Sequence, residues 1–283
     1  MQDVLISNKE HFEKNQEAII EAGPDKLHFI ADFDRTLTKA FVNGNPIASP
    51  MNVIRDEGYL GPEYTKQAQT NFDKYHPIEI DPEVSKEDKT KAMEEWWTKQ
   101  YELLKKHGLN KKHIDRAIRS RMVELREETD VLLATLNRLG IPLVIMSSSG
   151  LGNYSIRQYL KKEKLLFDNI YIVSNSFEWD DEGYLLTVKE PIIHSLNKYE
   201  TTISGADFYP KIKQRKNVVL LGDSLDDIGM VEGFDFDNLI KIAFLNPNTE
   251  ANTDAYNERY DVLLLGDTNM NFVNEFVAQL SAK

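Results

Sequence analysis

Asp32-Phe33-Asp34-Arg35-Thr36-Leu37-Thr38 follows directly on the apolar run Leu27-His28-Phe29-Ile30-Ala31. The run has the length and composition of a buried strand, and in an open α/β sheet ligands bind just beyond the carboxyl ends of the strands. Past the strand end the backbone turns, so Asp32 and Asp34 can converge, and two anions repel unless a cation relieves them. Such an oxygen-rich site suits Mg²⁺. The alternative is that the two aspartates only cap a turn, which is common for an isolated Asp-x-Asp.

Polar residues follow two more apolar runs farther along the chain. Ile141–Met146 leads into Ser147-Ser148-Ser149-Gly150. There a glycine lets the backbone approach closely, and the N–H groups that open the next segment can face a phosphate. Asn217–Leu221 leads into Gly222-Asp223-Ser224-Leu225-Asp226-Asp227. Carboxylates and hydroxyls at successive strand ends indicate a site for a phosphate and a metal at one edge of a sheet.

These segments resemble the motifs of the haloacid dehalogenase (HAD) superfamily, which consists mostly of phosphatases with an aspartate nucleophile. Asp32-x-Asp34-x-Thr36 resembles the first motif, and the serine loop resembles the second. Lys198, in His194-Ser195-Leu196-Asn197-Lys198, resembles the lysine of the third motif, and Gly222-Asp223 with Asp227 resembles the fourth. The four segments occur in the order of the superfamily motifs.

The resemblance implies a role for each matched residue. Asp32 would be the nucleophile, Asp34 the general acid and base, and Ser148 and Lys198 the ligands of the phosphate. The residues of the Mg²⁺ site would be Asp32, the backbone carbonyl of Asp34, Asp223, and Asp227 in support.

Apolar runs with the length of strands alternate along the chain with segments of helical periodicity. One such helix is predicted at Thr129–Leu139 and ends before Gly140, a good residue for a helix C-terminus. The predicted strands are Leu27–Ala31, Ile141–Met146, Ile170–Val173, Val218–Leu221, Ile240–Leu245 and Val262–Leu265. Alternation of this kind predicts an α/β fold with a doubly wound, mostly parallel, Rossmann-like sheet.

One interval, residues 39–124, interrupts this alternation. It contains no strong strand, and its periodicity predicts helices at Pro62–Tyr75, Lys86–His107 and Lys111–Val123. An interval of this length exceeds any plain loop, so we expect an inserted helical cap domain. Residues 1–38 and 125–283 would form the HAD-like core domain. Because the insertion follows the nucleophile strand, the cap would lie over the site, exclude water and recognise the substrate.

The composition agrees with a soluble enzyme and suits a reducing compartment. The 283 residues include 46 acidic and 34 basic side chains, and the net charge of −12 argues against binding to a nucleic acid backbone. The absence of cysteine excludes disulfides and thiolate metal sites. No apolar stretch approaches the roughly 20 residues of a membrane span, and the N-terminus resembles no secretory signal. We therefore expect a cytoplasmic protein without a membrane partner, as a monomer or a weak homo-oligomer.

Two segments of the predicted cap carry a more specific resemblance. Ile78-Glu79-Ile80-Asp81-Pro82 and Trp96-Trp97-Thr98-Lys99, together with the HAD motifs, resemble the cytosolic type III (pyrimidine) 5′-nucleotidases. The resemblance runs from about residue 25 to the C-terminus and includes an expected hairpin segment, Phe177-Glu178-Trp179-Asp180. It implies that Glu79 contacts the nucleobase or the sugar and that Asn52 is a second polar contact. Ser149 and Gly150 would complete the substrate loop.

The tryptophan pair also fits a nucleotide site on physical grounds, since an aromatic face can stack on a base. Adjacent helical residues point about 100° apart, so we expect only one of the two to face the ligand, and we choose Trp97. The alternative is that both pack inside the cap. For Glu79 the alternative is a surface carboxylate before a turn.

Together these features predict a Mg²⁺-dependent phosphomonoesterase that hydrolyses nucleoside 5′-monophosphates, pyrimidine nucleotides first, through an aspartyl-phosphate. Transfer of the phosphoryl group to a second nucleoside is an expected side reaction. The alternatives are a HAD phosphatase or phosphomutase for another small metabolite, and a binding module that has kept the fold without the activity.

Overall fold

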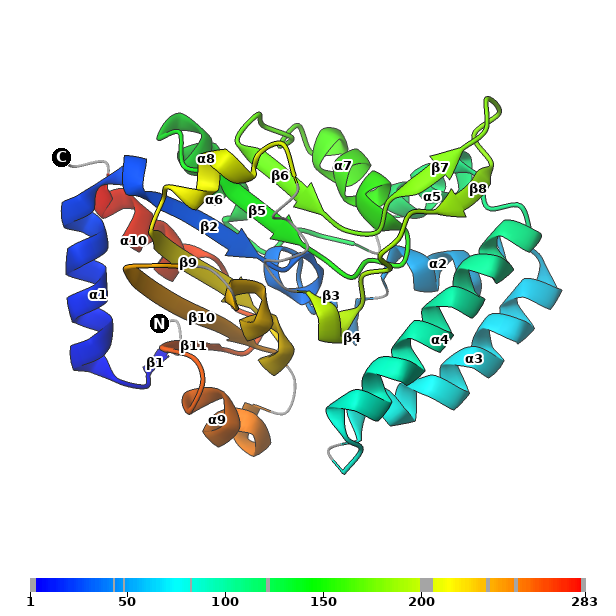
Figure 1. The fold of residues 1–283 in the computed structure, drawn as a ribbon, viewed down its shortest axis with the longest axis horizontal. Helices are drawn as coiled ribbons and strands as arrows, with labels where there is room; N and C mark the ends of the chain where they lie inside the picture. Colours follow the sequence, from blue (N-terminus) through cyan, green and yellow to red (C-terminus); the bar gives the residue numbers. More distant parts are fainter. Residues whose placement is uncertain are drawn as a thin grey trace.

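A computed structural model gives the structure of the protein, and it describes residues 4–42, 44–47, 49–81, 83–120, 123–198, 206–232, 235–246 and 249–280. A sheet with helices on both faces occupies one part of the molecule, and a group of helices lies beyond the carboxyl ends of its strands (Figure 1).

The sheet has seven strands in the order β1-β11-β10-β9-β2-β5-β6. All neighbours pair in parallel except β1, which runs antiparallel to β11 at the edge. The strands are β1 (Val4–Ile6), β2 (Leu27–Ala31), β5 (Leu143–Met146), β6 (Ile170–Val173), β9 (Asn217–Gly222), β10 (Asn238–Leu245) and β11 (Val262–Leu265). The predicted doubly wound, mostly parallel sheet is confirmed. Only the three-residue edge strand β1, too short to show a pattern, was not predicted.

Both faces of the sheet are buried, which explains why its central strands read as continuous apolar runs. In β2, Phe29 points to one face and Ile30 to the other. The first face packs on α1 (Lys9–Ala22), α6 (Thr129–Arg138), α7 (Gly152–Lys162) and α10 (Asn271–Leu280). The second face packs on α8 (Tyr209–Lys213), α9 (Thr249–Asn257) and the 3-10 helix η5 (Leu225–Val231).

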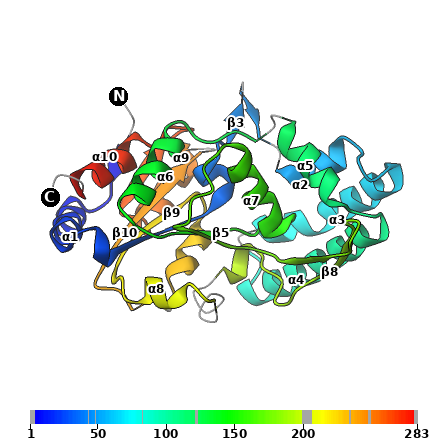
Figure 2. The ribbon, with the colours of Figure 1, turned by 90° about the horizontal axis from the view of Figure 1, so that it is seen from above.

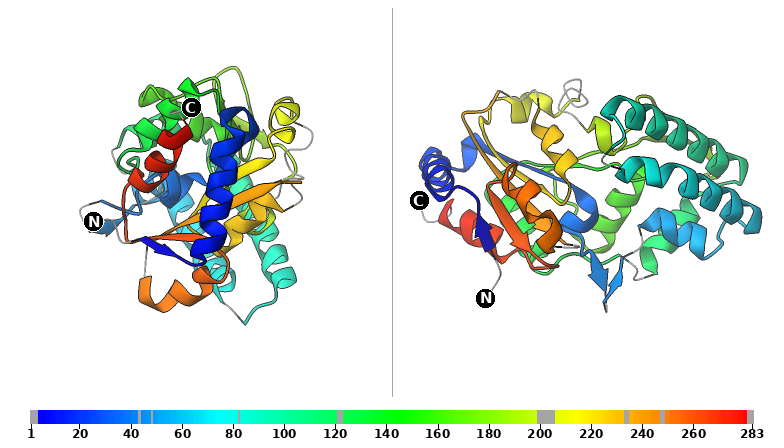
Figure 3. Two further views of the ribbon diagram at one scale, coloured as in Figure 1. Left: turned by 90° about the vertical axis from the view of Figure 1, so that its left-hand side faces the viewer. Right: turned by 90° about the horizontal axis from the view of Figure 1, so that it is seen from below.

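The described residues between 39 and 124 form a short hairpin and four helices. The hairpin is β3 (Phe41–Val42) with β4 (Asn45–Pro46), and the helices are α2 (Pro50–Asp56), α3 (Pro62–Ile80), α4 (Lys86–Lys106) and α5 (Lys111–Arg119). Their starts follow from capping: Ser49 and Ser85 accept backbone N–H groups at α2 and α4, and Asn110 forms a capping box with His113 at α5. Figures 2 and 3 show these helices beyond the sheet.

Helix α4 ends within one residue of its predicted end, whereas the ends predicted for α3 and α5 need correction. Helix α3 continues past the predicted end at Tyr75 to Ile80, with Pro77 inside it, so Glu79 lies on a helix rather than in a turn. A proline removes one N–H but leaves its own carbonyl, which accepts from Asp81 N at 3.2 Å. Helix α5 ends at Arg119; part of its predicted extension, residues 121–122, lies outside the described residues, as does Pro82.

A second hairpin, β7 (Phe177–Trp179) with β8 (Leu185–Val188), joins the helices of this interval from a distant part of the chain. Leu185 N donates to Leu109 O at 2.8 Å, and Lys111 N donates to Gly183 O at 3.0 Å. This hairpin matches the one expected at Phe177–Asp180. The division into a core of residues 1–38 and 125–283 and a cap of residues 39–124 stays a prediction.

Candidate active site

Three neighbouring strands bring the motif residues together. Because β2 lies between β5 and β9 and all three are parallel, their carboxyl ends meet, and Asp32, Ser148 and Asp223 follow these ends. A cavity of about 390 Å³ opens there, within the usual range for small-ligand sites. Its lining includes every site residue predicted above: Asp32, Asp34, Asn52, Glu79, Trp97, Ser148, Ser149, Gly150, Lys198, Asp223 and Asp227.

Lys198 lies between two buried carboxylates at the floor of this cavity. Its Nζ donates to Asp32 Oδ1 at 2.8 Å and to Asp227 Oδ1 at 2.7 Å, and all three side chains are buried. The segment before Lys198 is held by Asn175, which donates to Ile193 O and accepts from Ile193 N, both at 2.8 Å. No described residue hydrogen-bonds Asp32 Oδ2, so this oxygen can face a substrate.

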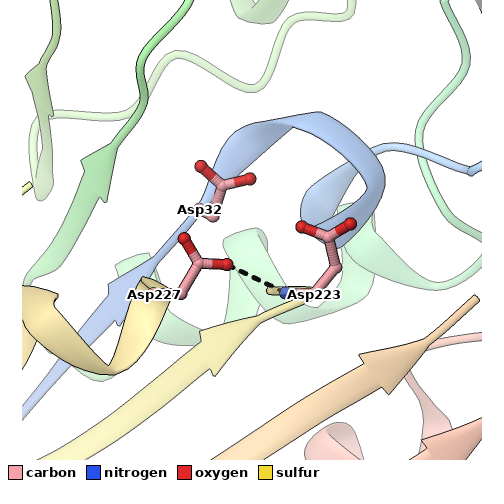
Figure 4. A group of neighbouring side chains, drawn as sticks. All are labelled: Asp32, Asp223 and Asp227. Atoms are coloured by element: carbon pink, nitrogen blue, oxygen red, sulfur yellow. Dashed lines mark hydrogen bonds between the residues drawn. The ribbon is translucent and has the colours of Figure 1, made fainter. Parts of the chain in front are cut away.

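Asp223 and Asp227 complete an acidic group with Asp32 (Figure 4). Each of the three offers a carboxylate oxygen within 4.8 Å of the others. Asp227 uses both of its oxygens inside the protein, since Oδ2 accepts from Asp223 N and Ser224 N at 3.0 Å each, and Oδ1 accepts from Lys198. This geometry favours Asp227 as a support of the site. Asp32 and Asp223 remain the better candidates for direct metal ligands.

Burial and mutual repulsion shift the proton affinities of this group. Burial raises the pKa of Asp32 to about 7, with Lys198 opposing and Asp227 adding to the shift. Burial also raises the pKa of Asp223 well above its ordinary value, and the charges of Asp227 and Asp32 raise it further. Burial lowers the pKa of Lys198, but the two carboxylates beside it outweigh this effect and raise it overall. With its carboxylates ionised the group carries excess negative charge, which a divalent cation would offset.

Asp34 lies in the tight turn that follows β2. Its side chain is half-buried and lines the cavity, and burial raises its pKa while Lys198 and Arg35 oppose the shift. The next residue, Arg35, has a φ of 61°, which is uncommon for a residue with a Cβ. Arg35 N donates to Thr38 Oγ1 at 2.9 Å, so the threonine at the end of the motif closes the turn.

The middle serine of the serine loop lines the cavity. Ser147 Oγ accepts from Ser149 N at 3.1 Å, and Ser149 Oγ pairs with Ser155 Oγ at 3.2 Å, so the outer two serines hold the loop. Ser148 is half-buried and lines the cavity. Gly150 is required by close packing, because a Cβ there would lie 2.5 Å from Met51 Cε and 2.7 Å from the Trp97 ring.

Aromatic rings line the part of the cavity that α3 and α4 form, here called its aromatic end. Trp96 stacks on Trp97 with ring centroids 5.9 Å apart, and Phe72 meets Trp96 edge-to-face at 6.1 Å. Both tryptophans line the cavity, so the expectation that only Trp97 of the pair faces the ligand stays a prediction. The rings continue the row through Tyr101, which stacks on Trp97 at 5.7 Å. Because Trp96 and Trp97 stack on each other, side chains from two faces of α4 reach the same cavity.

Glu79 and Asn52 also line the cavity, from α3 and α2. Glu79 Oε1 accepts from Ser195 Oγ at 3.0 Å, so the carboxylate bridges α3 to the segment that carries Lys198. The lining also includes residues that were not predicted, among them Met51, Arg55, Tyr64, Phe72 and Gln100. Helical spacing offers a signal for two of them, since Phe72 precedes Glu79 by seven positions and Gln100 follows Trp96 by four.

The comparisons with known proteins agree with this geometry. Residues 35–281 match the family model described as pyrimidine 5′-nucleotidase (UMPH-1). The chain belongs to this family. The resemblance to the type III 5′-nucleotidases, drawn above from Glu79, the tryptophan pair and the strand-end motifs, is thus confirmed, and so is its assignment as an enzyme of the 5′-nucleotidase class.

Relatives of this 5′-nucleotidase align along nearly their whole length. The 7-methylguanosine phosphate-specific 5′-nucleotidase A of Xenopus laevis is 33% identical over 266 residues, which cover 94% of this chain and 91% of that protein. The human 7-methylguanosine phosphate-specific 5′-nucleotidase is 33% identical over 258 residues, which cover 91% and 85%.

Solved structures place the fold in the HAD class. Cytosolic 5′-nucleotidase IIIB bound to cytidine superposes with a TM-score of 0.88 and 27% identity, over 99% of this chain and 93% of that one. Substrate-bound phosphoserine phosphatase, at 19% identity and a TM-score of 0.53, shares the fold over 89% and 98%. None of the helices in the described ranges has the length and apolar character needed to cross a membrane.

Proposed function

We propose that this 5′-nucleotidase hydrolyses nucleoside 5′-monophosphates through an aspartyl-phosphate on Asp32. One observation carries the proposal: Asp32, Lys198, Asp223 and Ser148 lie at one end of a cavity whose other end is a row of aromatic rings. The charged end suits a phosphate, and the aromatic end suits a nucleobase. Residues 39–124 would serve as the cap that supplies the aromatic end.

In the first step, Asp32 Oδ2 attacks phosphorus, and the bond from phosphorus to the 5′-oxygen of the nucleoside breaks. Asp34 donates its proton to that leaving oxygen, in keeping with its raised pKa. Lys198 and Ser148 hold the oxygens of the phosphoryl group as charge builds on them. The products are the free nucleoside and the aspartyl-phosphate.

In the second step, Asp34, now ionised, takes a proton from water, and the water oxygen attacks phosphorus. The bond to Asp32 breaks, so inorganic phosphate leaves and both aspartates return to their first state. Splitting one difficult displacement into two easier ones is the benefit of a covalent intermediate. A nucleoside in place of water would receive the phosphoryl group, which is the proposed transferase side activity.

The residues present fit a magnesium ion. Asp32 and Asp223 offer carboxylate oxygens within 4.8 Å of one another, together with Asp227, and magnesium prefers such hard oxygen ligands. Asp32, Asp223 and the Asp34 carbonyl would hold the ion, which would offset the negative charge of nucleophile and phosphate.

The base preference follows from the aromatic end and from the relatives. We propose pyrimidine nucleotides such as CMP as substrates, and 7-methylguanosine monophosphate as a second one, because relatives at 33% identity are named for that nucleotide. Methylation gives the guanine ring a positive charge. A cation between aromatic faces, with Glu79 nearby, is stabilised by cation–π attraction that the uncharged base lacks.

Phosphate release from CMP, UMP, 7-methyl-GMP and GMP, compared as kcat/KM with magnesium and with EDTA, tests the proposal. We expect activity that EDTA abolishes and magnesium restores, and a preference for 7-methyl-GMP over GMP. A sugar or amino-acid phosphate as the best substrate would contradict the nucleotidase proposal, and a requirement for a bisphosphate activator would indicate a mutase. A cytoplasmic location and a monomeric or weakly associated state remain our predictions.

A further inference from the structure

Arg126 lies where the chain returns from the predicted cap to the core, and its guanidinium is buried with 1% of the residue exposed. Its Nε donates to Thr36 O at 2.9 Å, and its Nη2 donates to Arg35 O and to Asn246 Oδ1, the latter at 3.0 Å. Its Nη1 donates to Asp267 Oδ1 at 3.0 Å. One side chain thus connects the turn after β2 with segments more than a hundred residues away.

Two partners of Arg126, the amide of Asn246 and the carboxylate of Asp267, also bind this part of the chain. Asn246 Nδ2 donates to Arg35 O at 3.0 Å, so this carbonyl accepts from two buried side chains. Asp267 accepts from Ala40 N and Phe41 N, at 3.0 Å each, where the chain leaves the core. We call Arg126, Asn246 and Asp267 the arginine clamp.

The clamp binds the two backbone segments that connect the core with the predicted cap. The outgoing chain pairs with the returning chain, because Lys39 N donates to Glu124 O and Arg126 N donates to Leu37 O, both at 2.9 Å. The clamp therefore holds both of these connecting segments. It also holds the carbonyl of Arg35, a residue whose φ of 61° is uncommon for a side chain with a Cβ.

We propose that Arg126 is a positioning residue for Asp34. Arg35 directly follows Asp34, so the backbone that the clamp holds sets where the Asp34 carboxyl points. The planar guanidinium suits this task, since its donors form a fixed fork that reaches several carbonyls at once, which a lysine ammonium does not. The inference rests on the proposed function, in which Asp34 protonates the leaving oxygen.

The test uses two substrates that differ in their need for that proton. CMP must lose a 5′-alkoxide and needs Asp34 as an acid, whereas p-nitrophenyl phosphate releases a stable anion and does not. Rapid-quench measurement of phosphoprotein formation isolates this first step. For Arg126→Lys we expect the step to slow by about tenfold or more with CMP and to stay within about threefold with p-nitrophenyl phosphate.

Arg215 provides a matched control at the opposite end of β2. It too donates to three backbone carbonyls, those of Pro24, Leu27 and Gly140, at 2.7, 3.0 and 3.2 Å. Arg215→Lys should lower the melting temperature but change the rates with both substrates by the same factor. A substrate-dependent effect in this control would overturn the positioning role, because general loosening of the core would then explain both variants.

Asn246→Ala keeps the test decisive if Arg126→Lys does not fold. It removes one of the two donors to the Arg35 carbonyl and one of the acceptors of the guanidinium but keeps Arg126 itself, so we expect about a threefold slowing with CMP alone. Equal slowing with both substrates, or none, would overturn the positioning role while the nucleotidase proposal stands. A wild-type protein that forms no phosphoprotein and releases no phosphate from CMP would overturn both.

Discussion

The two ends of the cavity are built in different ways. At the phosphate end, Asp32, Ser148 and Asp223 follow adjacent strands, and Lys198 is fixed by two buried ion pairs. At the nucleoside end, Phe72, Trp96 and Trp97 are half-buried residues of two helices that lie beyond the sheet. The backbone of the sheet sets the first end, whereas side-chain packing sets the second.

This difference separates chemistry from recognition. Shifting a strand end would move Asp32, Ser148 or Asp223, so the phosphate end tolerates little change. Replacing an aromatic ring on α3 or α4 changes what the cavity accepts and leaves the reacting groups in place. The two ends meet at Gly150, where the absence of a side chain lets Trp97 contact the serine loop. The following predictions test this separation.

The largest effect is expected from Asp32→Asn. The amide keeps the shape of the side chain but cannot attack phosphorus, so turnover should be abolished with every substrate while the circular dichroism spectrum stays native. Turnover above about 1% of wild type in saturating magnesium would contradict the role of Asp32.

Asp34→Asn should slow turnover of nucleotides by roughly 10² to 10⁴, as is usual for the loss of a general acid–base group. The second step also needs Asp34, so p-nitrophenyl phosphate should leave the variant loaded with phosphate. Intact-protein mass spectrometry after an acid quench would detect the added phosphoryl group. If no such species accumulates, Asp34 does not act as the base in the second step.

The core should also determine how the protein responds to acid. His28 lies fully buried within β2, and burial lowers its pKa to about 4. Its folded pKa is below the unfolded value, so its contribution is complete above pH 6.5 and is lost as the pH falls toward 4. The loss amounts to about 3 kcal/mol.

His28→Gln should remove this part of the acid sensitivity. Buried carboxylates such as Asp32 titrate in both proteins and cancel in the comparison. The difference in unfolding free energy between variant and wild type, from denaturant titrations at pH 7 and pH 4, should therefore shift by about 3 kcal/mol in favour of the variant at pH 4. An unchanged difference would mean that His28 is not the acid-sensitive group.

Trp97→Ala should act on the nucleoside end alone. A lost stacking face is worth about 1–3 kcal/mol, so kcat/KM for CMP should fall about tenfold or more. Activity toward p-nitrophenyl phosphate should stay within about threefold, because its phosphate contacts are unaffected. Phe72→Ala offers a matched variant from α3. Equal losses with both substrates would show that the rings support the cap instead of reading the base.

The smallest effect is expected at the contact between Glu79 and Ser195. A lost hydrogen bond is worth about 0.5–1.5 kcal/mol, so Glu79→Ala and Ser195→Ala should each lower kcat/KM for CMP by a few-fold. A double-mutant cycle decides what Glu79 does. If the double variant loses no more than either single one, Glu79 acts through Ser195; additive losses would indicate that Glu79 contacts the nucleoside directly.

The strand-end residues of the phosphate end could be predicted from the amino acid sequence. Strands buried on both faces appear as continuous apolar runs, and the residues directly after Ala31, Met146 and Gly222 must then lie at the ligand edge of a parallel sheet. This is a local relation between a strand and the turn that follows it, so it needs no knowledge of distant contacts. The same relation led to Asp32, to the serine loop and to Asp223, whereas the choice of Ser148 within the loop came from the resemblance to the HAD motifs.

Contacts between distant segments were decided only by the folded chain. The order β5-β2-β9, the place of Lys198 between two aspartates and the pairing of Glu79 with Ser195 all join residues that are far apart in sequence. Arg126 is the clearest case, because nothing near it in sequence distinguishes it from a surface arginine. Its role depends on carbonyls and side chains from three other segments, and such contacts follow from packing in three dimensions, on which local periodicity carries no information.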